Sequence, residues 1–306
     1  MFNVGKGSKV FEITENKSNK YLSAEKTRDY YLNLAADWND DLQAPEIREF
    51  AGRTLWDDSK TGVGTKGRWG DLLFSKVQTD EVVYVQPRVG WAGISLAALA
   101  KKYDKKLTLF MPSSKRISDH QLVCVERGAR PIFRRIAAMP VLNKYAKDYA
   151  EENNATFVPF GLDHELVVAA GVKSTIQQWA DRPEPEDVVS VISTGVLSRT
   201  LQIAFPNARF HGVAVARNMK DGEIGRADVV SYHRRFLQDA DKAKELSLEI
   251  NSAPNYDMKG MEYVADDVVD APKSLSTLVW NVAGDIKPMY NNHDSIDSYR
   301  EWGEVR

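Results

Sequence analysis

The sequence contains little cysteine and little histidine, and this limits the chemistry that it can support. Its one cysteine, Cys124, excludes an intramolecular disulfide, and the setting LVCV is typical of a small buried core residue. Five histidines are scattered along the chain without an HExxH or CxxC motif, which argues against a metal site. We therefore expect neither a disulfide-stabilised fold nor a metalloenzyme.

The sequence also lacks a hydrophobic run long enough to span a membrane, and its amino terminus has no apolar signal core. Its 41 basic and 43 acidic residues nearly cancel, so the net charge of −2 gives no overall attraction to nucleic acid or to membranes. We expect a cytoplasmic protein with no membrane association. The 306 residues, 43% of them hydrophobic, are sufficient for one or two cores.

Several common catalytic motifs are missing. The chain has no GxSxG nucleophile turn, no Walker GxxxxGK[ST] loop, and no GxGxxG after an apolar strand. These absences disfavour a serine hydrolase, a nucleoside triphosphatase and a dinucleotide-binding fold.

Helical and strand-like stretches alternate from residue 70 to residue 154. The apolar runs VVYV and LTLF show no period-2 alternation, which is typical of parallel strands buried on both faces. Helical stretches of about ten to fifteen residues separate them, as in βαβ units. The sequence therefore predicts an α/β protein with mainly parallel sheets flanked by helices.

The stretch from Gly62 to Gly93 contains two turns that are candidates for a ligand-binding site. Lys66 lies in a Gly/Thr-rich turn, a helix is expected from Trp69, and the strand Val82–Val85 ends in a second turn at 86–93. Glycines around Lys66 permit close approach of the backbone to a bound group. Two such turns facing each other would suit a planar, phosphorylated ligand.

Four segments carry a resemblance to a known family. They are TKGRWGDLL, QPRVGWAGISLAALAKKYDKKLTLFMPSS, LVCVERGARPIFRR and VVSVISTGVLSRTLQIAFPNARFHGVAV, which together cover roughly residues 54–215. In this order they resemble the cysteine synthase and tryptophan synthase β group, the fold-type II pyridoxal-phosphate (PLP) enzymes. Several segments in family order are more specific than a lone Gly-rich loop.

The resemblance implies a fold, a cofactor and a reaction class. The fold would be tryptophan synthase β-like, with a larger cofactor-binding domain formed by residues 1–69 and 149–306 and a smaller α/β domain formed by residues 70–148. Lys66 would hold PLP as a Schiff base and move protons at the α-carbon of a small amino-acid-like substrate. The reaction would be a lyase, β-replacement or decarboxylation reaction at Cα or Cβ, with elimination preferred, and family members commonly form homodimers. The alternative for Lys66 is a solvated loop lysine.

The segment SVISTGVLSRT is expected to bind the cofactor phosphate. A strand leads into Ser193, Thr194 and Gly195, and the next helix would direct backbone N–H groups and its positive dipole end towards an anion. The hydroxyl of Ser198 would add a hydrogen bond. An ordinary strand-to-helix turn capped by hydroxyls is the alternative.

The turn 86–93 departs from the family. Where the family places Thr, Ser and Asn, which bind a substrate carboxylate and the cofactor ring, this chain has Arg88, Val89, Gly90, Trp91, Ala92 and Gly93. Arg88, Gly90, Trp91 and Gly93 are expected to line the substrate side, with Arg88 as a carboxylate ligand and Trp91 stacked on the cofactor ring or on a nucleobase. A rim arginine and a core tryptophan are the alternatives.

Two further functions stay open at this stage. One is a tailoring enzyme, such as a viral one, that decarboxylates or otherwise modifies an amino acid attached to a nucleobase in DNA. A cluster of basic residues and Trp91 motivate it, although a solvated helix face explains such clusters equally well; its members are Lys115, Arg116, Arg127, Arg130, Arg134, Arg135, Lys144 and Lys147. The other is a non-catalytic binding module on the same fold.

Overall fold

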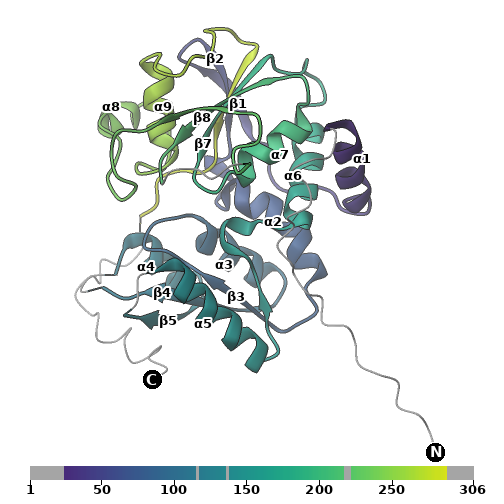
Figure 1. Cartoon of the computed structure of the whole chain (residues 1–306), viewed down its shortest axis with the longest axis vertical. Coiled ribbons are helices and arrows are strands. Elements are labelled where there is room, and N and C mark those ends of the chain that lie inside the picture. The colour runs from purple at the N-terminus through teal and green to yellow at the C-terminus, as the bar shows by residue number, and fades with distance from the viewer. Residues whose placement is uncertain (1–23, 115–116, 136–137, 217–221, 288–306) are drawn as a thin grey trace, which may run out of the picture.

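The computed structural model describes residues 24–114, 117–135, 138–216 and 222–287. Its strands form two separate sheets, which Figure 1 shows one above the other along the long axis of the molecule. This is the α/β class that the sequence predicts.

The larger sheet has six strands in the order β1-β2-β10-β7-β8-β9. Only β1 runs antiparallel to its neighbour, and all other pairings are parallel. The strands are β1 (Glu46–Phe50), β2 (Arg53–Asp57), β7 (Asp187–Ile192), β8 (Arg209–Ala214), β9 (Asp228–Ser231) and β10 (Thr277–Asn281). Strand β10, the last described strand along the chain, therefore lies in the middle of the sheet, between β2 and β7.

The smaller sheet is entirely parallel, with four strands in the order β5-β4-β3-β6. They are β3 (Glu81–Val85), β4 (Lys106–Pro112), β5 (Arg130–Arg134) and β6 (Thr156–Phe157). The apolar runs in β3 and β4 are buried on both faces, which explains their lack of alternation.

Helices cover both faces of both sheets. They are α1 (Ala24–Leu34), α2 (Gly64–Lys76), α3 (Ala92–Lys102), α4 (Asp119–Glu126), α5 (Met139–Glu152), α6 (Glu165–Gln178), α7 (Val196–Ala204), α8 (Ala243–Leu246) and α9 (Asp257–Ala265), with 3-10 turns η2 (Ser59–Thr61) and η3 (Phe160–Leu162). In Figure 1, α2 lies at the junction of the two sheets.

The strands of the larger sheet bury alternate residues on opposite sides. In β7, Val188 and Ile192 belong to the main core shared with α2, α6 and α7, whereas Val189 and Val191 pack in a second core with α9. Two tryptophans, Trp56 and Trp280, stack in the main core with ring centroids 4.1 Å apart. The main core continues to one face of the smaller sheet, while α5 covers its other face. Continuous packing thus fixes α2 between the sheets.

The predicted domain boundaries at 69/70 and 148/149 stay a prediction. Helix α2 spans the first boundary and α5 spans the second, and β6, at residues 156–157, pairs with β3 in the smaller sheet. No helix in the described ranges is both long enough and apolar enough to cross a membrane.

Candidate functional site

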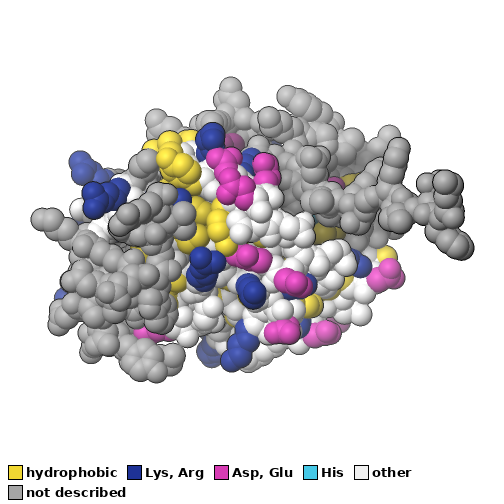
Figure 2. All heavy atoms as spheres, turned by 90° about the horizontal axis from the view of Figure 1, so that it is seen from below, with side chains coloured by type: hydrophobic (Ala, Val, Ile, Leu, Met, Phe, Trp, Pro, Cys, Tyr) yellow, Lys and Arg dark blue, Asp and Glu magenta, His cyan; other side chains and the backbone are white. Residues whose placement is uncertain are grey.

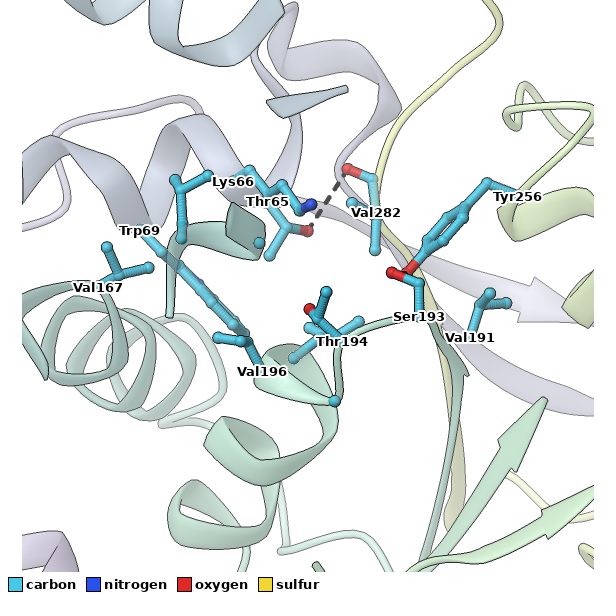
Figure 3. Close-up of a pocket in the computed structure, with 14 residues that line it drawn as sticks. Thr65, Lys66, Trp69, Val167, Val191, Ser193, Thr194, Val196, Tyr256 and Val282 are labelled. Carbon is cyan, nitrogen blue, oxygen red and sulfur yellow. Dashed lines mark hydrogen bonds between the residues drawn. The ribbon is translucent and has the colours of Figure 1, made fainter. Parts of the chain in front are cut away.

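A pocket lies where α2, the carboxyl ends of β7 and β10, and the turn η3 meet. The space between its walls, open solvent included, is about 490 Å³. Figure 3 shows Lys66, Thr194 and Tyr256 around its centre. Its lining comprises Thr65, Lys66, Trp69, Gly161, Leu162, Val167, Val191, Ser193, Thr194, Gly195, Val196, Leu197, Tyr256 and Val282.

Lys66 lies in the first turn of α2, because the helix begins at Gly64 and not at Trp69 as expected. Gly64 has a φ of 63°, and a Cβ there would lie 2.8 Å from the carbonyl oxygen of Val282. The N–H of Thr65 donates to the same carbonyl at 2.9 Å. Glycine at position 64 therefore lets the helix begin against the end of β10, which places Lys66 in the pocket.

The Lys66 amine is poorly solvated. Part of the residue is open to the pocket, yet burial lowers the pKa of the amine to about 8, and the opposing effect of Asp257 is smaller. A lysine with a lowered pKa in a cleft is typical of a nucleophilic or proton-transferring role. The solvated loop lysine considered above does not describe this position.

Asp257, the first residue of α9, is a fully buried acid near Lys66, and no sequence motif marks it. Among the described residues neither oxygen of its carboxyl has a hydrogen-bond partner of normal geometry, although the N–H groups of Val282 and Ala283 lie near it. Burial raises the pKa of this carboxyl well above its ordinary value, against the smaller effects of those N–H groups and of Lys66. A buried carboxyl without a partner is costly unless a ligand pairs with it.

The turn 193–195 joins β7 to α7 on the opposite side of the pocket from Lys66 (Figure 3). Gly195 is the N-cap of α7 with a φ of 76°, and a Cβ there would lie 1.8 Å from the carbonyl oxygen of Glu223. Within the described part of the chain no side chain caps α7, so its first N–H groups are available to an anion. Ser193 accepts a hydrogen bond at 3.2 Å from the hydroxyl of Tyr256.

Two polar residues of α7 form hydrogen bonds with other residues of the protein. Ser198 is buried outside the pocket lining, where its hydroxyl accepts a hydrogen bond at 3.0 Å from Gln202. The guanidinium of Arg199 donates to both oxygens of Asp163 at 3.1 Å and to the carbonyl of Glu223 at 2.7 Å. The turn thus brings Ser193, Thr194 and Gly195 to the pocket, and Ser198 lies apart from them.

The turn 86–93 does not contribute to the pocket lining. Arg88 is exposed, and its backbone carbonyl accepts a hydrogen bond from Ser118. Trp91 packs against the main core, where its indole N–H is buried without a partner. Gly90 and Gly93 are both bonded to the side chain of Gln86. Their predicted roles in substrate binding, and that of Trp91 at the cofactor, stay predictions.

Five members of the basic cluster make contacts within the protein: Arg127, Arg130, Arg134, Lys144 and Lys147. Arg127 donates to the carbonyl of Gly62 at 2.9 Å, Arg130 to the hydroxyl of Tyr149 at 3.1 Å, and Lys144 pairs with Asp148 at 2.9 Å. Figure 2 shows basic and acidic side chains interspersed on this end of the molecule. Lys115 and Arg116 lie outside the described residues. Nothing in the described part of the cluster favours binding to DNA.

The residues present fit PLP. The pocket offers a desolvated amine at Lys66 and an uncapped helix start at the turn 193–195, which suit the aldehyde and the phosphate of PLP. Asp257 follows the lining residue Tyr256 in the chain, but its own carboxyl is fully buried and does not line the pocket. No group of three or more potential metal ligands occurs among the described residues.

Solved structures share this architecture. An ACC deaminase homologue matches with a TM-score of 0.69 and 17% sequence identity, over 88% of this chain and 98% of its own length. Maize serine racemase gives a TM-score of 0.65 at 13% identity, over 92% and 99% of the two chains. For threonine deaminase isoform 2 from Solanum lycopersicum the TM-score is 0.67 at 11% identity, over 96% and 98%.

No family model matches the sequence, and no curated protein matches it. The structural matches extend over nearly the full length of both chains, so they concern the whole two-sheet architecture and not one βαβ unit. The protein has the fold of the fold-type II pyridoxal-phosphate enzymes, as the sequence predicts.

Proposed function

We propose that this chain is a PLP-dependent enzyme that acts at Cα or Cβ of an amino-acid-like substrate, as a lyase or in β-replacement. The observation that carries the proposal is the desolvated Lys66 amine in one pocket with the turn 193–195. The structural neighbours, which include deaminases, racemases and a diaminopropionate ammonia lyase, support a reaction at an amino acid.

Two parts of the chain would hold the cofactor. Lys66 would bind it through the amine, and the turn 193–195 with the first N–H groups of α7 would bind the phosphate. When bound, PLP supplies an electron sink for the bonds at the substrate α-carbon.

Lys66 would also move the proton at the substrate α-carbon. At pH 7 an amine with a pKa of about 8 is neutral in about one molecule in ten, against about one in 3,000 at the ordinary value of 10.5. Burial thus increases the fraction of Lys66 that can attack an aldehyde or accept a proton. The apolar walls formed by Leu162, Val167 and Val196 would exclude water from this amine.

An absorbance titration tests the proposal. Wild-type protein mixed with PLP is expected to develop a visible band, and Lys66→Ala is expected to lose it. Lys60→Ala is the matched control, because Lys60 is exposed and pairs with Glu46 at the surface. A wild type that stays colourless in excess PLP would overturn the proposal and favour a non-catalytic module on the same fold.

A further inference from the structure

Arg199 lies in the first turn of α7 and joins three separate segments of the chain. One terminal nitrogen of its guanidinium, Nη1, donates to the carbonyls of Thr194 at 3.2 Å and of Glu223 at 2.7 Å. The other terminal nitrogen, Nη2, donates to both carboxylate oxygens of Asp163 at 3.1 Å. Both arms of the planar guanidinium are thus occupied by acceptors, an arrangement that a lysine ammonium cannot reproduce.

Two of these segments form walls of the pocket. Gly161 and Leu162, in the turn η3 immediately before Asp163, line the pocket, and so does Thr194. The two walls lie against each other, because a Cβ at Gly161 would lie 2.7 Å from the hydroxyl oxygen of Thr194. The pair between Arg199 and Asp163 therefore holds η3 against the turn 193–195.

The third segment contains Glu223 and lies against Gly195. A Cβ at Gly195 would lie 1.8 Å from the carbonyl oxygen of Glu223, which is the same oxygen that accepts from Arg199. A second side chain of α7, that of Gln202, also holds this segment by donating to the carbonyl of Ile224 at 2.8 Å. The backbone at the start of α7 is therefore enclosed on the side away from the pocket.

The contacts of Arg199 favour a geometric role over an electrostatic one. Asp163 neutralises its charge, and Arg199 is not among the described residues that line the pocket. The two side chains are 27% and 45% exposed, and ion pairs of this exposure contribute little to the stability of a whole fold. The pair therefore matters chiefly for the local position of the segments that it joins.

We propose, resting on the proposed function, that Arg199 is a positioning residue for the cofactor phosphate. Without touching the phosphate, it holds the turn 193–195 in the conformation in which the first N–H groups of α7 meet an anion. The role requires the fork of the guanidinium and not its charge alone. Binding of a phosphorylated ligand should then depend on Arg199, whereas binding of the same ligand without its phosphate should not.

The experiment compares PLP with pyridoxal, which lacks the phosphate, by titrating the visible band that each forms with the protein. Arg199→Lys keeps the positive charge and loses the fork. We expect it to weaken PLP binding by about tenfold, the effect of losing one charge-assisted hydrogen bond, and to leave the affinity for pyridoxal unchanged. A general loss of stability would weaken both ligands alike and would not change the ratio of the two affinities. An unchanged ratio in Arg199→Lys would overturn the inference.

Asp163→Asn separates geometry from charge. This variant removes the counter-charge of Arg199, so an arginine that acts through its charge would bind PLP more tightly. Loss of the paired geometry should instead lower the ratio of PLP affinity to pyridoxal affinity, in the same direction as Arg199→Lys. A ratio in Asp163→Asn that equals or exceeds that of the wild type would contradict the positioning role.

Arg209→Lys is the matched control. Arg209 also pairs with an aspartate, Asp187 at 2.7 Å, but this pair lies at the amino ends of β8 and β7, whereas the pocket lies at the carboxyl end of β7. Its ratio should equal that of the wild type. Wild-type protein that forms a band with neither probe would refute the proposed function. A wild type that binds both probes, with a ratio that Arg199→Lys leaves unchanged, would refute only this inference.

Discussion

Lys66, in the first turn of α2, lies near the carboxyl of Asp257, the first residue of α9, and each affects the pKa of the other. The aspartate raises the pKa of the amine, and burial lowers it further than the aspartate raises it. Asp257 is fully buried and does not line the pocket, so its effect on Lys66 acts from behind the pocket wall.

The first prediction concerns the stability of the apoprotein. In the folded state the pKa of Lys66 falls from 10.5 to about 8, so the unfolded state binds more protons between these values and stability should rise with pH there. Lys66→Met should abolish this rise and stabilise the protein below pH 8 by up to about 3 kcal/mol. Urea unfolding at a series of pH values measures both effects. Lys60→Met should show the same pH dependence of stability as the wild type. If stability also rises between pH 8 and 10.5 in Lys66→Met, as in the wild type, the Lys66 amine is exposed to water.

The second prediction concerns Asp257→Asn. Removal of the negative charge should lower the pKa of Lys66, since Asp257 raises it. The pH at which PLP attaches at half its maximal rate should then move below that of the wild type, as measured by stopped-flow absorbance. Glu262→Gln on the same helix is the control, because the Glu262 carboxylate bonds to Tyr232 and to the Lys242 N–H. An identical midpoint in Asp257→Asn would show that Asp257 is uncharged near Lys66.

The third prediction separates backbone strain from the phosphate site. Gly195 and Gly128 both have positive φ, 76° and 96°, but only a Cβ at Gly195 would meet another atom. Gly128→Ala should cost about 1–2 kcal/mol of stability through backbone strain, and Gly195→Ala should cost more because its Cβ also meets the carbonyl oxygen of Glu223. Gly195→Ala should in addition weaken PLP binding by about tenfold or more, because the turn must shift. Equal affinities of the two variants for PLP would exclude the turn 193–195 as the phosphate site.

The fourth prediction concerns the buried ion pairs of Arg68, which lies two residues after Lys66 in α2. Arg68 is completely buried and pairs with Asp40 at 2.5 Å and with Asp58 at 3.1 Å. Arg68→Met leaves two buried carboxylates without a counter-charge and should cost about 3–5 kcal/mol of stability. Lys144→Ala, which removes an exposed pair with Asp148, should cost less than about 1 kcal/mol. Similar unfolding midpoints for the two variants would contradict the role of Arg68 as the counter-charge of Asp40 and Asp58.

Local patterns were sufficient to predict much of the fold. The uniformly apolar runs of β3 and β4 indicated parallel strands because burial on both faces removes alternation. The family resemblance, and not a local pattern, led to the expectation that Lys66 and the turn 193–195 share one site, and both line the same pocket.

The rest of the site depends on contacts between residues distant in the sequence. Asp257 lies near Lys66 because α9 packs against β7 and β8, and no motif marks that packing. Gln86 is bonded to Gly90 and Gly93 through a side-chain amide, which composition does not reveal. Ser198 is turned towards Gln202 by the helix itself and lies outside the pocket lining, so its predicted bond to the cofactor phosphate stays a prediction.

The most direct test is to identify the lysine that PLP modifies. Wild-type protein is treated with PLP, reduced with borohydride, digested, and its peptides are mapped by mass. Lys259 is an internal control, because burial also lowers its pKa to about 8 while its amine donates to the carbonyl of Arg235 at 3.0 Å. We predict one stoichiometric pyridoxyl adduct on Lys66 and none on Lys259. An adduct distributed over several lysines, or absent from Lys66, would contradict the account.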